Sequence, residues 1–240
     1  MANSNGFPNF RAGSAVRTPF EGGLRAFMLQ VYNYMAGGLV LTGVTAYLGA
    51  ATGFYARIVG TPLFWVVLFA PLALVLLLSF RIDRMSTGAA QLCFWGYAAL
   101  VGLSLSGIVL VYTGDSIARV FFITAGTFAA TSVYGYTTQR DLTRFGSFLI
   151  MGLFGIIIAS LVNIFLKSTA LQMTMSVMGV IVFAGLAAYD TQRLKNIYFS
   201  GGGGAAVAGK TAILGALALY LDFLNLFLML MQQLGDRRDR

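Results

Sequence analysis

The amino-acid sequence predicts an all-α polytopic membrane protein with seven transmembrane helices. Of its 240 residues, 58% are hydrophobic and 10% are charged, whereas about 25% of the residues in soluble domains are charged. The mean hydropathy of +0.80 agrees with this imbalance. A single soluble core could not enclose so much apolar surface. The apolar residues also form long continuous runs rather than the alternating pattern of a membrane β-barrel.

The helices are predicted from the intervals between charged residues, because a membrane-spanning helix needs about 20 mostly apolar residues. The expected helices lie near residues 26–50, 62–80, 88–112, 118–138, 145–166, 172–194 and 210–233. Pro62 is placed to begin the second helix, and Pro71 inside that helix is expected to bend it. The last apolar interval is interrupted only by Asp222.

The chain is predicted to form one membrane domain, residues 25–235, with no second domain and no internal repeat. A disordered cytoplasmic tail (1–24) precedes this domain, and a charged tail (236–240) follows it. The connection 195–209 contains four consecutive glycines and is predicted to be a flexible linker between the last two helices.

The distribution of basic residues predicts the orientation of the helices, because Lys and Arg are enriched in cytoplasmic loops. One side receives ten of them: Arg11, Arg17, Arg25, Arg81, Arg84, Arg140, Arg144, Arg193, Lys195 and Lys210. The loops on the other side receive Arg57, Arg119 and Lys167. We therefore expect a cytoplasmic N-terminus, and we assign the net charge of +8 to membrane topology rather than to a nucleic-acid partner.

The C-terminal tail conflicts with this rule. Seven spans place the tail outside, although it carries Arg237, Arg238 and Arg240. Either the tail is exported despite its charge, or the last segment does not cross the membrane completely. The asymmetry of the other loops favours export.

The absence of histidine excludes several kinds of site at once. A chain with no His has no His-based zinc site, no Ser-His dyad of the rhomboid protease type and no His pH switch. Cys93 is the one cysteine, so no internal disulfide forms. Proton sensing near physiological pH must therefore depend on carboxyl groups.

Asp222 is the strongest candidate for a functional residue. It lies about 12 residues into the last predicted helix, roughly 18 Å from its start. An ionised Asp near the membrane centre costs about 2.5–3.5 kcal/mol, so its side chain should face protein or water and have a partner. Small or polar residues recur along the same side of this helix: Gly215, Ala218, Asp222, Asn225, Met229 and Gln232. The alternative is a polar contact that only holds helices together.

Asp190 is the second candidate, in the segment YDTQR (residues 189–193) near the end of the sixth predicted helix. Arg193 follows it at the i+3 position, so the two could also form an ordinary surface ion pair. Arg81, Asp83 and Arg84 follow the second helix and are most simply loop charges, although one arginine could reach an aspartate in the bundle.

Two segments, AAYDTQRLKNIY (residues 187–198) and ALALYLDFLNLFLMLMQQLG (residues 216–235), resemble the signature of the Bax inhibitor 1 family, the transmembrane Bax inhibitor motif proteins. The chain is similar to bacterial members of that family. The resemblance implies a fold in which six helices wrap a central C-terminal helix, and a calcium leak governed by pH. It places the family's aspartate pair on Asp190 and Asp222. It also implies an arginine latch at the end of the second helix, where Arg81 or Arg84 matches by location.

The chemistry of two adjacent carboxyl groups agrees with this implied activity. In a low-dielectric environment two ionised carboxylates repel each other and tend to share one proton, which gives a His-free protein a proton sensor. Calcium prefers oxygen ligands, so a charged pair would attract it. We expect no cofactor; calcium would be a permeant or weakly bound ion.

Two functional hypotheses follow. In the first, the protein is a pH-sensitive calcium leak channel gated by Asp190 and Asp222. In the second, it is a membrane interaction protein that regulates membrane proteases, stress or cell-death signalling through other membrane proteins, and its aspartates are structural. An enzyme is not expected, because the aspartate segments lack the neighbouring glycine of two-aspartate membrane proteases. The likeness to bacterial proteins points to the lipid bilayer of an inner membrane.

Overall fold

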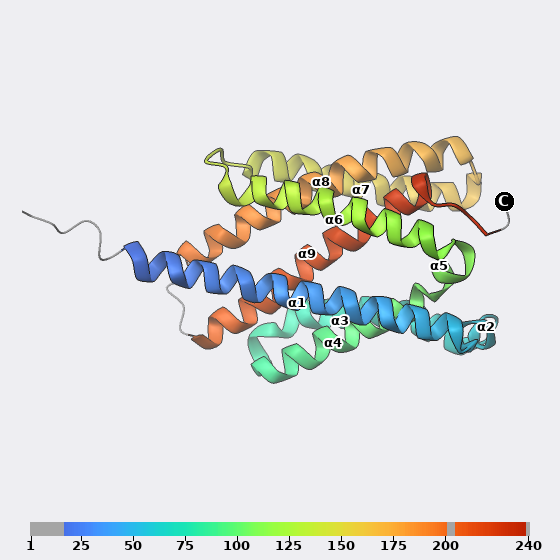
Figure 1. Ribbon diagram of the computed structural model, residues 1–240, viewed down its shortest axis with the longest axis horizontal. Helices are drawn as coiled ribbons and strands as arrows, with labels where there is room; N and C mark the ends of the chain where they lie inside the picture. The colour runs from blue at the N-terminus through green and yellow to red at the C-terminus, as the bar shows by residue number, and fades with distance from the viewer. Residues whose placement is uncertain (1–16, 201–204, 239–240) are drawn as a thin grey trace, which may run out of the picture.

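The computed structural model describes residues 17–200 and 205–238 (Figure 1). These residues form helices and no strand: α1 (Arg17–Ala51), α2 (Phe54–Ile58), α3 (Pro62–Arg81), the 3-10 helix η1 (Ile82–Arg84), α4 (Thr87–Ser104), α5 (Ser106–Val111), α6 (Gly114–Thr137), α7 (Thr143–Leu166), α8 (Thr169–Ser200) and α9 (Ala205–Leu234). Most of the predicted N-terminal tail and the row of glycines at 201–204 lie outside the described residues.

Seven helical segments are long and apolar enough to cross a membrane: Gly22–Ala51, Pro62–Arg84, Thr87–Val111, Gly114–Thr137, Thr143–Leu166, Thr169–Ser200 and Gly209–Leu234. They confirm the all-α polytopic membrane fold that the apolar intervals predict. The third span is divided by Leu105 into α4 and α5, and α3 continues without a break across Pro71.

The helices extend further than the apolar intervals do. The first helix begins at Arg17, so residues 17–24 of the predicted tail are helical, and α8 continues to Ser200 rather than ending at 194. Hydropathy detects only the part of a helix that matches the hydrocarbon thickness, and polar turns at either end escape it. Some helix ends do carry recognisable signals: Ser86 and Thr113 accept hydrogen bonds from the first turns of α4 and α6.

The spans form two groups with α9 between them (Figure 1). Helices α1, α3 and α4 pack together on one side, and α6, α7 and α8 pack together on the other. Helix α9 packs against α1 and α4 from the first group and against α6 and α8 from the second, whereas α3 and α7 form their main contacts with α4 and α8. In its most apolar segment α9 is 67% buried, against 11–33% for the other spans. Helix α9 therefore joins the two groups.

Glycine allows the closest helix contacts in both groups. A Cβ atom on Gly102 of α4 would overlap the carbonyl oxygen of Thr42 on α1. A Cβ atom on Gly135 of α6 would overlap the carbonyl oxygen of Ala188 on α8. Small residues at such crossings let membrane helices approach backbone to backbone.

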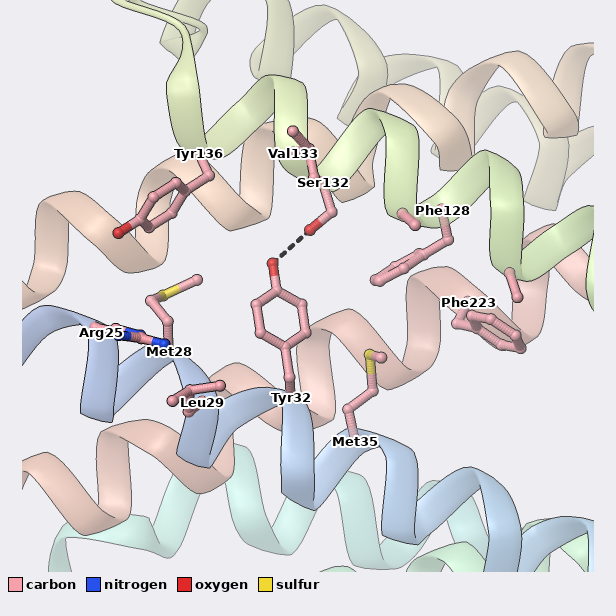
Figure 2. A pocket seen from close by; sticks show the side chains of 12 residues that line it. Arg25, Met28, Leu29, Tyr32, Met35, Phe128, Ser132, Val133, Tyr136 and Phe223 are labelled. Atoms are coloured by element: carbon pink, nitrogen blue, oxygen red, sulfur yellow. Dashed lines mark hydrogen bonds between the residues drawn. The ribbon is translucent and has the colours of Figure 1, made fainter.

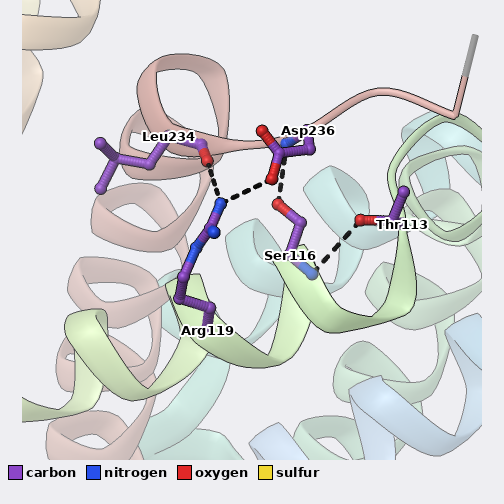
Figure 3. A network of polar contacts seen from close by, with 5 residues as sticks. All are labelled: Thr113, Ser116, Arg119, Leu234 and Asp236. Atoms are coloured by element: carbon purple, nitrogen blue, oxygen red, sulfur yellow. Dashed lines mark hydrogen bonds and ion pairs between the residues drawn. The ribbon is translucent and has the colours of Figure 1, made fainter. Parts of the chain in front are cut away.

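The end of the chain is fixed against the start of α6 (Figure 3). A guanidinium nitrogen of Arg119 donates to a carboxylate oxygen of Asp236 at 2.8 Å and to the carbonyl of Leu234 at 3.1 Å. The backbone N–H of Asp236 donates to Ser116 Oγ at 2.8 Å. These contacts place the tail where the third span meets the fourth, at the opposite end of the bundle from the start of α1 (Figure 1). Helix α9 therefore runs from one end of the bundle to the other.

Candidate functional site

The site is built from two aspartates on neighbouring helices. Asp190 of α8 and Asp222 of α9 lie within hydrogen-bonding reach of each other. Asp222 is buried, with 6% of its surface exposed, and the Asp190 side chain is 17% exposed. Because α8 continues to Ser200, Asp190 lies about 15 Å from the end of its helix, deeper than expected from the sequence.

The hydrogen bonding of this pair is incomplete. Asp222 Oδ2 is buried and accepts no hydrogen bond from any donor that the structure describes. Ionised carboxylates have only acceptor atoms, but a protonated carboxyl is also a donor. A proton on either aspartate would turn one of these acceptors into a donor and allow a hydrogen bond between the two carboxyl groups. Buried polar atoms without partners are rare in native proteins and call for an explanation.

The arginine beside the pair is not one of the two candidates taken from the family pattern. Arg193 Nη1 lies 3.9 Å from Asp190 Oδ1, and its side chain is 61% exposed. Arg81 and Arg84 are exposed, and within residues 17–200 and 205–238 neither forms an ion pair with an aspartate of the site. The fold explains this, because α3 packs on α4, on the opposite side of α9 from α8. In this structure the expected latch is therefore replaced by a long, exposed contact from α8 itself.

A cavity of about 630 Å³ adjoins the pair, between α7, α8 and α9. Its walls are mainly aliphatic side chains of α7, and Asp190, Asp222 and Asn225 supply polar groups. Asn225 lies one turn beyond Asp222, and its Nδ2 donates to the carbonyl of Leu221 at 2.8 Å. Part of the polar stripe predicted on the last helix therefore faces this cavity.

The stripe continues toward the C-terminal end of the bundle. Gln232 Oε1 accepts a hydrogen bond from Ser176 Oγ at 3.1 Å, and both residues line a second cavity of about 470 Å³. Between the two cavities, the side chain of Met229 lies directly against Gly179 of α8. From the aspartate pair toward the C-terminus of α9, the seam between α8 and α9 thus carries Asn225, then Met229, then the contact of Gln232 with Ser176.

A chain of hydroxyl groups, which sequence reasoning did not find, reaches the residue after Asp190. The Tyr32 hydroxyl lies 2.5 Å from Ser132 Oγ (Figure 2). Ser132 Oγ lies 2.7 Å from Thr191 Oγ1, which in turn donates to the carbonyl of Ala187. This chain joins α1, α6 and α8 beside the pair. No sequence signal identifies it, because Ser and Thr are common in membrane helices and only the helix rotations bring these three together.

The described residues contain no group of three or more His, Cys, Asp or Glu side chains that could hold a metal ion. Calcium takes 6–8 oxygen ligands in its tight sites, and the pair provides two carboxyl groups. Two carboxyl groups alone do not complete the coordination shell of a tightly held calcium ion.

Comparison with known proteins places the whole bundle in one family. The sequence profile described as inhibitor of apoptosis-promoting Bax1 matches residues 24–239. The chain is 51% identical over 221 residues to an uncharacterized protein of Rickettsia prowazekii, covering 92% of this chain and 93% of that one. It is 48% identical over 225 residues to the inner membrane protein YbhL of Escherichia coli, covering 90% and 94%. The resemblance seen in the last two helices thus extends along nearly the full length, and the chain belongs to the Bax inhibitor 1 family of integral membrane proteins.

Proposed function

We propose that this protein is a pH-sensitive calcium leak channel in which Asp190 and Asp222 form the gate. The observation that carries the proposal is the buried contact between the two carboxyl groups, with Asp222 Oδ2 lacking a donor beside a cavity. Membrane-buried carboxyl groups that face a cavity are characteristic of ion and proton pathways.

The charge of the pair supports the choice of a cation. When the carboxyls are ionised, they are the concentrated negative charge on the α8–α9 seam, and hard cations such as calcium bind carboxylate oxygens. The polar groups along the same seam, Asn225 and then Gln232, mark a route from the pair to the C-terminal end of the bundle. The side chain of Met229 packs against Gly179 along that route, so conduction along the seam would require Met229 to move.

The pH dependence of the proposed channel is argued from the absence of a hydrogen-bond donor to Asp222 Oδ2. A shared proton joins α8 to α9 by a hydrogen bond and lowers the negative charge, whereas full ionisation removes that bond and makes the two carboxylates repel. Protonation therefore changes both the attraction for cations and the contact between the helices.

The orientation and location belong to the same proposal. We place the N-terminus in the cytoplasm on the basis of the basic residues. We place the protein in a bacterial inner membrane because YbhL, to which it is similar, is named as an inner membrane protein. The C-terminal tail and its contact with Arg119 would then lie outside the cytoplasm.

The test is calcium flux into proteoliposomes loaded with a calcium dye, measured as a function of pH on both sides of neutrality, because protonation of the pair would change its charge. Asp222→Asn keeps the size of the side chain and removes its charge. We expect this variant to lose the pH dependence that the wild type shows. Asp83→Asn is the matched control, because it makes the same chemical change in an exposed residue that lines neither cavity of the α8–α9 seam. Unchanged flux for Asp222→Asn at every pH would refute the proposal.

The second candidate is an interaction protein that regulates membrane proteases or stress signalling through other membrane proteins. The observation that favours it is the wide apolar surface of α3 and α7, whose spans are only 17% and 11% buried and could dock other helices as well as lipid. In that case crosslinking in native membranes should recover a stable partner, folded protein should show no flux, and aspartate variants should loosen the packing of α8 on α9.

A further inference from the structure

A lateral groove of about 640 Å³ lies between α1 and α6 (Figure 2). Its walls come from α1 and α6, and Phe223 of α9 lies at its inner end together with Phe128. Helix α1 packs mainly on α4 and α9, and α6 packs mainly on α8 and α9. Helices α1 and α6 therefore each pack against other helices on their far sides, and the space between α1 and α6 is left open.

Apart from Arg25 and Tyr136 at one end, Tyr32 and Ser132 are the polar side chains among the residues that line the groove. Its lining is mostly apolar, with Met28, Met35 and Phe128 among the buried side chains. The hydroxyls of Tyr32 and Ser132, which also line it, are hydrogen-bonded to each other. A hydrocarbon chain leaves no polar group of this surface without a partner, whereas a polar ligand would find none to bind there.

The length of the groove matches one leaflet of a bilayer. Arg25 and Met35, at its two ends on α1, are ten residues apart, which is about 15 Å along a helix. The hydrocarbon core of a bilayer is about 30 Å thick, so one leaflet occupies about half of that distance. The groove can therefore accept one acyl chain from the leaflet on the side where α1 begins.

The end of the groove nearest the start of α1 is positively charged. Arg25 lies at this end together with Tyr136 (Figure 2). Lys195 donates to the carbonyl of Tyr136 at 2.7 Å, and its Nζ lies 5.8 Å from the centre of the Tyr136 ring. Neither Arg25 nor Lys195 forms an ion pair with a carboxylate whose side chain the structure describes. An anionic headgroup would meet two basic groups there.

We propose that this groove is a binding site for one anionic phospholipid, with an acyl chain between α1 and α6 and the headgroup phosphate on Arg25. The site does not depend on calcium conduction. The bound chain would contact Tyr32, which begins the hydroxyl chain to Thr191, so the lipid would stabilise the contact between α1 and the helix that carries Asp190. A ligand that binds only the folded state raises the unfolding temperature.

The test measures lipid binding by native mass spectrometry on the full chain in neutral detergent. Phosphatidylglycerol and phosphatidylcholine with the same acyl chains are added separately. Ala129→Phe places a ring in the groove, whereas Ala130→Phe makes the same change at an exposed neighbour outside it. Arg25→Gln removes the exposed charge at the groove's end and leaves the apolar walls intact.

We expect one tightly held phosphatidylglycerol on the wild type and on Ala130→Phe, and at least a roughly tenfold weaker affinity on Ala129→Phe. Arg25→Gln should reduce the preference for phosphatidylglycerol over phosphatidylcholine by roughly fivefold, the effect of one basic residue at an anionic surface. Equal binding by Ala129→Phe and Ala130→Phe would overturn the proposal, because the lipid would then be part of the general annulus. Loss of a dimer in Ala129→Phe, with lipid binding unchanged, would overturn it in favour of a second copy in the groove.

Discussion

Two faces of α9, only two residues apart, handle buried polar groups in opposite ways. Tyr220 faces α1 and α4 and is completely buried, and its hydroxyl lies 2.6 Å from Thr42 Oγ1. Thr42 Oγ1 uses its own proton to donate to the carbonyl of Ala98 at 2.9 Å, so Tyr220 is the donor to Thr42. Asp222 faces α8, and its Oδ2 has no donor among the described residues.

The surroundings of Tyr220 and Asp222 also differ, because Tyr220 is tightly packed and Asp222 borders a cavity. The ring of Tyr220 packs edge-to-face against Phe94 and Tyr97, with ring centres 6.1 and 5.6 Å away. Asp222 lies beside a cavity of about 630 Å³. A buried polar group whose bonds are complete fixes one arrangement of helices, whereas one that lacks a partner beside open space leaves room for a proton or an ion. The comparison separates the face of α9 toward α1 and α4, which is structural, from the face toward α8, which we assign to function.

The largest effect is expected from removing the Tyr220 side chain. Tyr220→Ala leaves a cavity among Phe94, Tyr97 and Thr42, and large-to-small changes of a buried aromatic destabilise by about 3–5 kcal/mol. Tyr220→Phe is the matched control, because it removes only the hydroxyl and should destabilise by about 1 kcal/mol. Denaturant unfolding in detergent measures both variants. Similar losses for the two would mean that the hydrogen bond, and not the packing, holds α9 to the first group.

Asp222→Leu is expected to change the free energy of unfolding less than Tyr220→Ala does, and not to lower it. Burying an ionisable carboxyl that lacks a hydrogen-bond donor costs free energy, and a leucine of similar size does not carry that cost, while Asp190 keeps its contact with Arg193. We expect the free energy of unfolding to stay within about 1 kcal/mol of the wild type or to rise, while the pH-dependent flux disappears. A loss as large as that of Tyr220→Ala would instead make Asp222 a structural contact, and the two faces of α9 would be alike.

The fold can be predicted well from the sequence, because the transfer of apolar helices into the membrane dominates it and the apolar intervals are easily recognised. Seven apolar intervals give seven spans, whereas the polar helix ends, the break at Leu105 and the short helices α2 and η1 are missed. The sequence also points to both aspartates, because an aspartate inside an apolar segment is rare enough to stand out and the segments around Asp190 and Asp222 carry the family signature.

The partners of the pair are harder to predict, since they depend on how each helix is rotated and on which neighbour it meets. Arg81 and Arg84 match the expected latch by location, yet the packing of α3 on α4 keeps them from the pair. The hydroxyl chain from Tyr32 to Thr191 needs three helices in register. Both depend on contacts between distant segments, which a single sequence does not encode in any local pattern.

Asp141 extends the comparison to a carboxylate outside the membrane spans. Its replacement should have the smallest effect on stability of the three. It lies in the short connection before α7, fully exposed, where its Oδ1 accepts hydrogen bonds from the Thr143 hydroxyl at 2.6 Å and the Thr143 N–H at 2.9 Å. These bonds, helped by the charge of Arg144, lower the pKa of Asp141 below its ordinary value of 3.8. Asp141 thus resembles Tyr220 in having its hydrogen bonds complete, but it is surrounded by water.

Because the folded-state pKa of Asp141 is the lower one, its ionised form contributes stability above pH 3.8 and loses that contribution as the pH falls through the folded-state pKa. Asp141→Asn should therefore show a slightly weaker decline of unfolding temperature than the wild type below about pH 4, and no difference in calcium flux near neutral pH. Thermal unfolding at a series of acidic pH values measures the first, and the proteoliposome assay measures the second. A change in the neutral-pH flux would show that gating extends to the connection before α7, and it would weaken the assignment of pH sensing to the pair between α8 and α9.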